Sequence, residues 1–207
     1  MNSKLVDLLR EVDSLKVRLS SLRPLPVEAL KKIQDALDIE YTYESNRIEG
    51  NTLTLQETAL VVNEGITIFG KSMREHLEAI NHAEAIDYIK EVAKQDIGIS
   101  QRTIKEIHAL VLHGIDRENT GSYRTVPVMI SGCTHVPPQP YLLEKLMEDF
   151  MLAFQRMEKE NVHPVIIAAY LHNGEDTSIY RWQRAYFSTS DEPLPVTERL
   201  YHCYPEK

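Results

Sequence analysis

Residues 45–54 read Ser-Asn-Arg-Ile-Glu-Gly-Asn-Thr-Leu-Thr, and this stretch separates two helices in the N-terminal half of the chain. A helix is expected over 27–45, and Gly50 is a residue type that commonly ends a helix. Thr54 is followed three residues later by Glu57, which is the spacing of a capping box at a helix start. The stretch therefore predicts a short turn between two helices.

Helical periodicity also occurs on both sides of this turn. Further helices are expected over 3–22, over 71–94, after a capping serine at Ser100, over 140–160 and over 164–172. The helix over 71–94 is expected to bury one face formed by Met73, Leu77, Ile80, Ala83, Ile86 and Ile89. A β-rich stretch over 123–131, with a turn at 132–134, predicts one β-hairpin. The expected fold class is mainly α.

The first predicted helix carries one apolar seam. Six residues recur at alternating intervals of three and four, namely Leu5, Leu8, Val12, Leu15, Leu19 and Leu22. Prolines at Pro24 and Pro26 end this helix. Such a seam either docks a helix on its own domain or forms a homodimer, and docking is the arrangement that we expect.

Composition excludes several classes of protein. The chain has 207 residues, of which 43% are hydrophobic and 26% are charged, which is typical of one folded domain with a helical extension. Its formal net charge is −8 and it has no basic block, so binding to nucleic acid or a membrane surface is not expected. The N-terminus does not resemble a signal peptide, and no stretch has the apolar length of a membrane span. A cytoplasmic location is expected.

Neither the cysteines nor the histidines form a metal-binding pattern. Cys133 and Cys203 are too few for a disulfide framework or a structural zinc site. The histidines are expected on polar faces or as hydrogen-bonded core residues, namely His76, His82, His108, His113 and His135. A structural role is also expected for His172.

Three stretches together resemble a known family. Residues 45–50 have the pattern Ser/Thr-x-x-x-Glu-Gly/Asn, residues 121–138 begin Gly-Ser-Tyr-Arg-Thr, and residues 163–172 begin His-Pro-Val-Ile-Ile. In this order they are similar to the inhibitory helix, the flap hairpin and the helix before the catalytic loop of Fic-domain proteins. The resemblance covers residues 27–172 and implies a Fic-type helical domain with one β-hairpin flap.

The resemblance also implies an activity and a regulatory site. Fic enzymes transfer AMP from ATP, with Mg²⁺, to a Ser, Thr or Tyr hydroxyl of another protein. Glu49 would inhibit this reaction by pairing with a loop arginine that the γ-phosphate otherwise engages, with Ser45 and Gly50 positioning it. The flap strand, which lies beside the nucleotide and docks the target, would comprise Val128, Met129, Ile130 and Ser131. The alternatives are a solvated residue for Glu49 and an ordinary half-buried hairpin for the flap.

The catalytic loop of the family, His-Pro-Phe-x-Asp/Glu-Gly-Asn-Gly-Arg, is missing from the printed sequence. Residues 173–207 have no helical or strand period and contain three prolines. Permitted codons for residues 176–185, together with the first base of codon 186 and read one base later, encode Ile-His-Pro-Phe-Ile-Asp-Gly-Asn-Gly-Arg. We therefore interpret residues 173–207 as an out-of-frame tail, and an authentic tail is the alternative.

The predicted organisation has three parts. They are an N-terminal helix and linker over 1–26, an incomplete Fic-like domain over 27–172 with an inhibitory helix near 40–50, and the irregular tail over 173–207. No AMP transfer is expected, because the family's general base, metal ligand and phosphate-binding arginine lie in the missing loop. The alternative function is a non-enzymatic fragment that binds an intact homologue. Addition and removal of AMP are both compatible with the resemblance.

Overall fold

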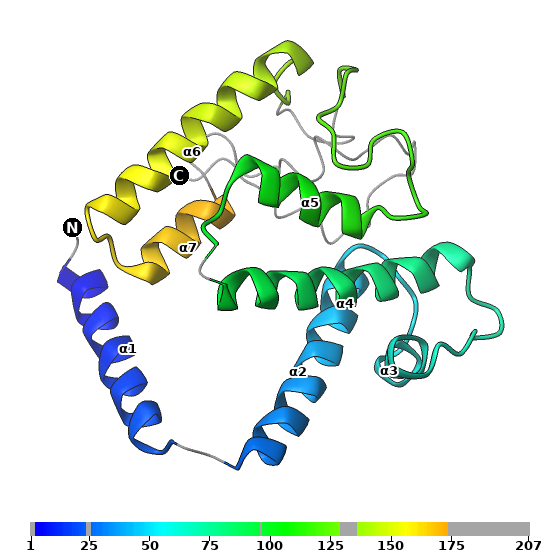
Figure 1. The fold of residues 1–207 in the computed structure, drawn as a ribbon, viewed down its shortest axis with the longest axis horizontal. Coiled ribbons are helices and arrows are strands. Elements are labelled where there is room, and N and C mark those ends of the chain that lie inside the picture. The colour runs from blue at the N-terminus through cyan, green and yellow to red at the C-terminus, as the bar shows by residue number, and fades with distance from the viewer. Residues whose placement is uncertain (1–2, 24–25, 96, 129–135, 174–207) are drawn as a thin grey trace.

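A computed structural model describes residues 3–23, 26–95, 97–128 and 136–173, and within these ranges the chain is helical (Figure 1). The elements are α1 (Ser3–Ser21), α2 (Val27–Ile48), α3 (Leu55–Glu64), α4 (Met73–Lys94), α5 (Gln101–Val111), the 3-10 helix η1 (Pro140–Leu142), α6 (Leu143–Lys159) and α7 (Pro164–Asn173). The prediction of a mainly α fold is confirmed. None of these helices has the length and apolar character needed to cross a membrane.

The predicted helix starts agree with local hydrogen bonds. The Thr54 hydroxyl accepts the backbone N–H of Glu57 at 3.2 Å, and the Glu57 carboxylate accepts the backbone N–H of Thr54 at 2.8 Å, which completes the capping box before α3. Ser100 caps α5 by accepting the backbone N–H of Thr103 at 3.1 Å. These bonds satisfy backbone donors that have no partner inside the helix.

Two clusters of buried apolar side chains form the core. The larger one lies on α6 and consists of Leu143, Met147, Phe150, Met151 and Phe154. Side chains of α5 and α7 pack against it, and the rings of Phe150 and Tyr170 stack with centroids 5.5 Å apart. The smaller cluster joins α3 to α4 through Leu53, Val61 and Ala79. The core is therefore divided between the two ends of the helical array.

Helix α4 is buried on more than one side. It packs against α2, α3 and α5, and its buried side chains are those of His76, Ala79, Asn81 and Ala85. The predicted single face is wrong, because Met73 remains 66% exposed and Ile89 46% exposed. A central helix with three neighbours does not need the one apolar stripe that a surface helix has.

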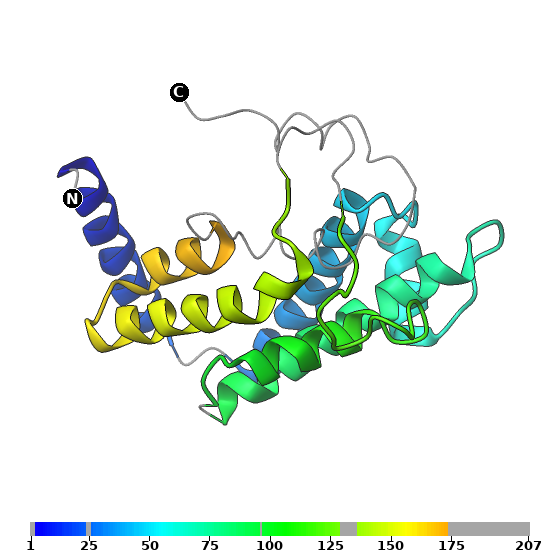
Figure 2. The ribbon, with the colours of Figure 1, turned by 90° about the horizontal axis from the view of Figure 1, so that it is seen from above.

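Helix α1 lies at the edge of the molecule (Figure 2). Its bounds agree with the prediction, but the predicted docking of the apolar seam is wrong. All six seam residues are exposed, with values from 40% at Leu5 to 70% at Leu22. The side chain that α1 buries is instead Leu9, which is 7% exposed.

The predicted hairpin is not seen in the described residues. Residues 129–135 lie outside the described ranges, and residues 123–128 and 136–139 on either side have no strand assignment. The predicted tail over 173–207 also lies outside the described residues, apart from Asn173 at the end of α7.

Candidate regulatory site at the end of helix α2

Helix α2 ends in a Schellman motif that depends on Gly50. The backbone N–H of Gly50 bonds the carbonyl of Arg47 at 3.1 Å, and the backbone N–H of Asn51 bonds the carbonyl of Asn46 at 3.0 Å. Gly50 has φ of +96°, in the region that side chains disfavour. Gly50 therefore ends the helix, as predicted, although the helix continues three residues beyond the expected end at Ser45.

The motif residues Ser45 and Glu49 meet in the last turn of α2. The backbone N–H of Glu49 donates to the carbonyl of Ser45 at 3.3 Å. Glu49 is exposed, whereas Ser45 is half-buried. The neighbouring Arg47 pairs with Glu44 at 2.6 Å, and this hydrogen bond raises the pKa of Arg47. Glu49 is therefore an exposed acidic residue at the helix end, and Glu44 pairs with the adjacent arginine.

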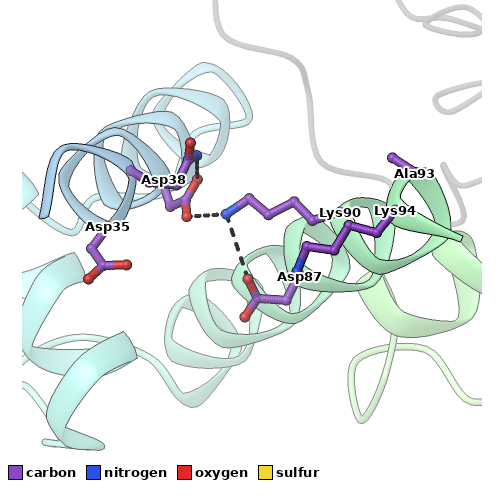
Figure 3. A pocket seen from close by; sticks show the side chains of 7 residues that line it. Asp35, Asp38, Asp87, Lys90, Ala93 and Lys94 are labelled. Atoms are coloured by element: carbon purple, nitrogen blue, oxygen red, sulfur yellow. Dashed lines mark hydrogen bonds and ion pairs between the residues drawn. The ribbon is translucent and has the colours of Figure 1, made fainter. Parts of the chain in front are cut away.

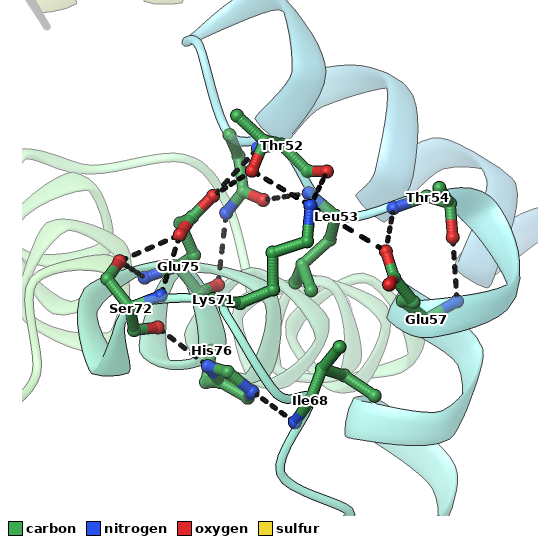
Figure 4. A network of polar contacts seen from close by, with 10 residues as sticks. Thr52, Leu53, Thr54, Glu57, Ile68, Lys71, Ser72, Glu75 and His76 are labelled. Atoms are coloured by element: carbon green, nitrogen blue, oxygen red, sulfur yellow. Dashed lines mark hydrogen bonds and ion pairs between the residues drawn. The ribbon is translucent and has the colours of Figure 1, made fainter.

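The turn after Gly50 is fixed to helix α4 by the contacts of Thr52 with Glu75 (Figure 4) and by those of Asn51. The Asn51 side-chain N–H₂ donates to the backbone carbonyl of Glu75 and to the carboxylate of Glu78, each at 3.0 Å. The Asn51 carbonyl oxygen accepts the backbone N–H of Leu53 at 2.9 Å. Asn51 is 7% exposed, so these bonds also satisfy a buried polar side chain.

Glu75 joins the same turn to the start of α4. One of its carboxylate oxygens accepts the backbone N–H and the hydroxyl of Thr52, and the other accepts the backbone N–H and the hydroxyl of Ser72. These hydrogen bonds, led by the one from the Thr52 hydroxyl, lower the pKa of Glu75 to about 2. The ionised carboxylate therefore links the turn after α2 to the capping box of α4.

Lys71 completes this network from the loop before α4. Its ammonium group donates to the backbone carbonyl of Thr52, and to the Thr52 hydroxyl at 3.0 Å. It also lies 3.9 Å from the carboxylate of Glu57, whose pKa is lowered chiefly by the hydrogen bond from the Thr54 backbone. A cation placed between these groups balances the charge of two neighbouring carboxylates.

Two further contacts attach the preceding part of α2 to α4. Lys90 pairs with Asp38, and His82 lies 3.2 Å from the hydroxyl of the fully buried Thr42. These contacts occur in reverse order along α4, so the two helices run in opposite directions. Desolvation lowers the pKa of His82, which favours its neutral form at this interface.

The Lys90 contact lies in an open pocket of about 570 Å³ between α2 and α4 (Figure 3). Lys90 reaches Asp38 on α2 and Asp87 on its own helix, the latter at 3.8 Å. The remaining lining residues are Gln34, Asp35, Ala93 and Lys94. The pocket is bridged by the ion pair between Lys90 and Asp38. This pair holds α2 and α4 in position relative to each other.

The segment that resembles the flap lies between α5 and η1. Val128 is half-buried, whereas Met129, Ile130 and Ser131 fall outside the described residues. The guanidinium of Arg124 donates to the carbonyl of Val126 at 2.9 Å and to the carbonyl of Pro138. Arg124 is 3% exposed, so a buried arginine holds together the two ends of this segment.

His76 and His108 make hydrogen bonds that hold neighbouring backbone segments. The Nε2 atom of His76 accepts the backbone N–H of Ile68 at 2.8 Å, which leaves its Nδ1 to donate to the carbonyl of Ser72. The Nδ1 atom of His108 accepts the backbone N–H of Gly121 at 3.1 Å, and burial lowers the pKa of His108 to about 4. The described residues contain no group of three or more His, Cys, Asp or Glu side chains that fits a metal ion.

Sequence reasoning missed Lys71, Ser72, Glu75 and Arg124. Ser72 and Glu75 have the same Ser-x-x-Glu spacing that identified the start of α3, so this pattern was available as a signal. Lys71 and Arg124 have no comparable local pattern, because their partners lie 19 and 14 residues away.

The helical array is that of a domain of the Fic/DOC class, as the comparisons with known proteins show. The Fic/DOC family model matches residues 98–175, from the loop before α5 to just beyond α7. The chain belongs to the Fic/DOC family.

Relatives with assigned names are similar over most of this chain. A protein adenylyltransferase Fic from Drosophila persimilis is 33% identical over 164 residues, which is 79% of this chain and 32% of the relative. A protein adenylyltransferase Fic from Nematostella vectensis is 33% identical over 80% of this chain and 38% of its own length. The chain thus spans about a third of the length of the curated relatives it matches.

Solved structures have the same architecture. A Fic domain containing signaling protein from Bacteroides thetaiotaomicron is 27% identical, with a TM-score of 0.71 over 78% of this chain and 62% of that one. Fic-1 from C. elegans, residues 134–508, is 29% identical, with a TM-score of 0.67 over 82% of this chain and 51% of that one.

Proposed function

We propose that the chain derives from a protein adenylyltransferase whose transfer of AMP from ATP to a protein hydroxyl is restrained by Glu49. The observation that carries this proposal is the exposed carboxylate of Glu49 at the end of α2, on a helix end fixed by Gly50 and Asn51. A stretch of 164 residues in a chain of 207 includes residues 44–164 wherever it begins, so the similarity to the named relatives extends over this motif.

The proposed restraint acts through charge. A carboxylate at a fixed helix end can pair with an arginine that the γ-phosphate of ATP would otherwise engage. The network of Asn51, Thr52 and Glu75 supports this role, because it prevents the helix end from moving away from α4. ATP and Mg²⁺ are the cofactors that we propose for the family reaction. The described residues contain no group of three or more His, Cys, Asp or Glu side chains that could hold a metal ion, and we assign no step through the metal to them.

We further propose that the printed chain does not transfer AMP. The family match ends at residue 175, which supports the interpretation of residues 173–207 as an out-of-frame tail. Without the family's catalytic loop, the chain lacks the general base and the arginine that acid–base and electrostatic catalysis require.

Three proteins made side by side test these proposals. They are the printed chain, the product of a synthetic gene that continues from codon 176 in the shifted frame, and that restored product with Glu49→Gly. AMP labelling from [α-³²P]ATP should be absent in the first, low in the second and higher in the third. Glu160→Gly in the restored product is the matched control, because Glu160 is the exposed C-cap of α6 with φ of −80°, close to the −81° of Glu49.

Each part of the proposal has its own contrary result. Labelling by the printed chain would contradict the proposed inactivity. Equal labelling by the restored product with and without Glu49→Gly would contradict the restraint by Glu49, while leaving the transferase activity established. Sequencing an independent clone across codons 165–207 decides whether the shifted frame is the natural one.

The exposed seam of α1 favours a second candidate function, a non-enzymatic fragment that binds an intact homologue. A soluble printed chain that co-purifies with the restored product would support this function. Separate elution of the two proteins would contradict it.

A further inference from the structure

Helix α1 presents a continuous apolar seam to solvent. The seam residues, with their exposed fractions, are Leu5 (40%), Leu8 (50%), Val12 (42%), Leu15 (51%), Leu19 (55%) and Leu22 (70%). Their alternating spacing of three and four residues is that of the a and d positions of a heptad repeat. Five of these residues lie on one helix of 19 residues and Leu22 follows directly after it, which is an unusually complete seam to leave in water.

The attachment of α1 leaves this seam available. Asp13 bonds the Nε2 atom of His163 at 3.3 Å, and Leu9 is the buried side chain of the helix. Leu9 and Asp13 are four residues apart, so they lie on one stripe that flanks the seam. The helix therefore contacts the rest of the chain beside its seam, and the seam itself has room for a partner.

We propose that the seam pairs with the same helix of a second copy of the chain, in an antiparallel arrangement. When the two helices are antiparallel, each of the six layers of the interface pairs an a position of one copy with a d position of the other. Leu5 then faces Leu22, Leu8 faces Leu19, and Val12 faces Leu15 of the second copy.

The charges beside the seam favour this direction. In the antiparallel register Glu11 of one copy lies beside Arg18 of the other, and two-fold symmetry repeats this attractive pair. In a parallel register Glu11 would lie beside Lys16, but Arg18 would lie beside Arg23 and repel it. Glu11, Lys16 and Arg18 are all exposed, and neither Glu11 nor Arg18 has an ion-pair partner among the described residues.

The second copy fits the seam better than the chain's own tail does. Residues 173–207 have no apolar periodicity, so they offer no complementary stripe. A helix of 19 residues is about 28 Å long, which is short for a coiled coil and predicts a weak, concentration-dependent dimer.

Analytical ultracentrifugation of the full chain over a range of concentrations tests the pairing. We expect twice the monomer mass at the highest concentrations. Glu11→Arg alone and Arg18→Glu alone each place like charges together and should raise the dissociation constant by roughly tenfold. The double variant Glu11→Arg/Arg18→Glu should restore the original value, because it reverses the pair. Ser14→Arg, at a heptad position away from the seam, should leave the dissociation constant unchanged.

Disulfide cross-linking tests the direction. In a chain with Cys133→Ser and Cys203→Ser, the variants Leu8→Cys and Leu19→Cys should cross-link with each other and not with themselves. Cross-linking of either variant with itself would contradict the antiparallel arrangement. A monomer at all concentrations would overturn the proposal. If the cysteines of that monomer resist a thiol reagent, the chain's own residues cover the seam instead.

Discussion

Glu75 and Thr52 are joined by two hydrogen bonds to one carboxylate oxygen, at 2.9 Å from the backbone N–H and 2.6 Å from the hydroxyl of Thr52. The second oxygen of Glu75 is occupied by Ser72 at 2.8 and 2.9 Å. A single carboxylate thus connects the turn after α2 with the residue that caps α4. Because only the ionised group can accept all four bonds, the geometry explains why the pKa of Glu75 falls to about 2.

Glu75→Gln should destabilise the fold. We expect the free energy of unfolding at pH 7 to fall by about 1.5–3 kcal/mol, the usual range for hydrogen bonds to charged groups. The contribution of Glu75 is complete above its ordinary pKa of 4.5 and is lost as the pH falls towards 2. Urea denaturation at pH 7 and at pH 3 measures both effects, and the difference between variant and parent should shrink at the lower pH.

Glu84→Gln is the matched control for this measurement, because Glu84 is an exposed residue on the same helix. Equal losses of stability in the two variants would show that the Glu75 network does not hold the turn.

Gly50→Ala should destabilise the end of α2. A residue with a side chain at φ of +96° costs about 1–2 kcal/mol in a left-handed conformation. The expected result is a fall of this size in the free energy of unfolding, with faster hydrogen exchange at the backbone N–H groups of Gly50 and Asn51. Gly98→Ala is the control, since no atom lies within 4 Å of the added methyl group. Unchanged exchange at Asn51 would contradict the role assigned to Gly50.

His108 should make the fold less stable in mild acid. The pKa of His108 is about 4 in the folded chain and 6.5 for an unperturbed histidine. Between these two pH values the unfolded chain therefore binds a proton that the folded chain does not. Stability is complete above pH 6.5 and falls by about 3 kcal/mol as the pH drops to 4. The variant His108→Asn keeps an acceptor for the backbone N–H of Gly121. Its urea midpoint should change less between pH 7 and pH 5 than that of the parent. The control variant His113→Asn, at an exposed position, should show the same dependence of the urea midpoint on pH as the parent. If His108→Asn also keeps the parental dependence on pH, the assignment to His108 is refuted.

Arg124→Met should destabilise the region between α5 and η1. It removes the donors of two carbonyl groups, those of Val126 and Pro138, and leaving a buried polar group without a partner costs about 1–3 kcal/mol. Thermal unfolding measured by circular dichroism should show a clearly lower midpoint. Arg117→Met, at an exposed position, should show little change. Equal midpoints in the two variants would show that Arg124 does not hold these segments.

Local signals in the sequence were sufficient for most helix boundaries. The Thr54–Glu57 capping box, the Ser100 cap and Gly50 act on neighbouring backbone groups, so a short window of sequence contains the whole interaction. Which side of a helix is buried depends on packing between distant elements. The single face predicted for α4 was therefore wrong, and the α1 seam was expected to dock although Leu9 is the residue that α1 buries.

The motif of the candidate site could be predicted from the sequence, but the long-range hydrogen bonds that hold it in place could not. Ser45, Glu49 and Gly50 are adjacent in the sequence, and their meeting at a helix end follows from helical geometry. The contacts of Asn51 and Thr52 with Glu75 span more than twenty residues, so no periodicity indicates them. The regulatory role of Glu49 and the flap role of Val128 and the three residues after it stay predictions.

The Arg124 contact affects which changes of length this domain can tolerate between Val126 and Pro138. One buried side chain fixes both the entrance and the exit of the segment between Val126 and Pro138, so the helices meet the same two anchor points whatever that segment contains. Doubling the length of a flexible loop costs only about 0.6 kcal/mol once its ends are held. Because Arg124 holds both ends, we expect a change of length between Val126 and Pro138 to cost little stability.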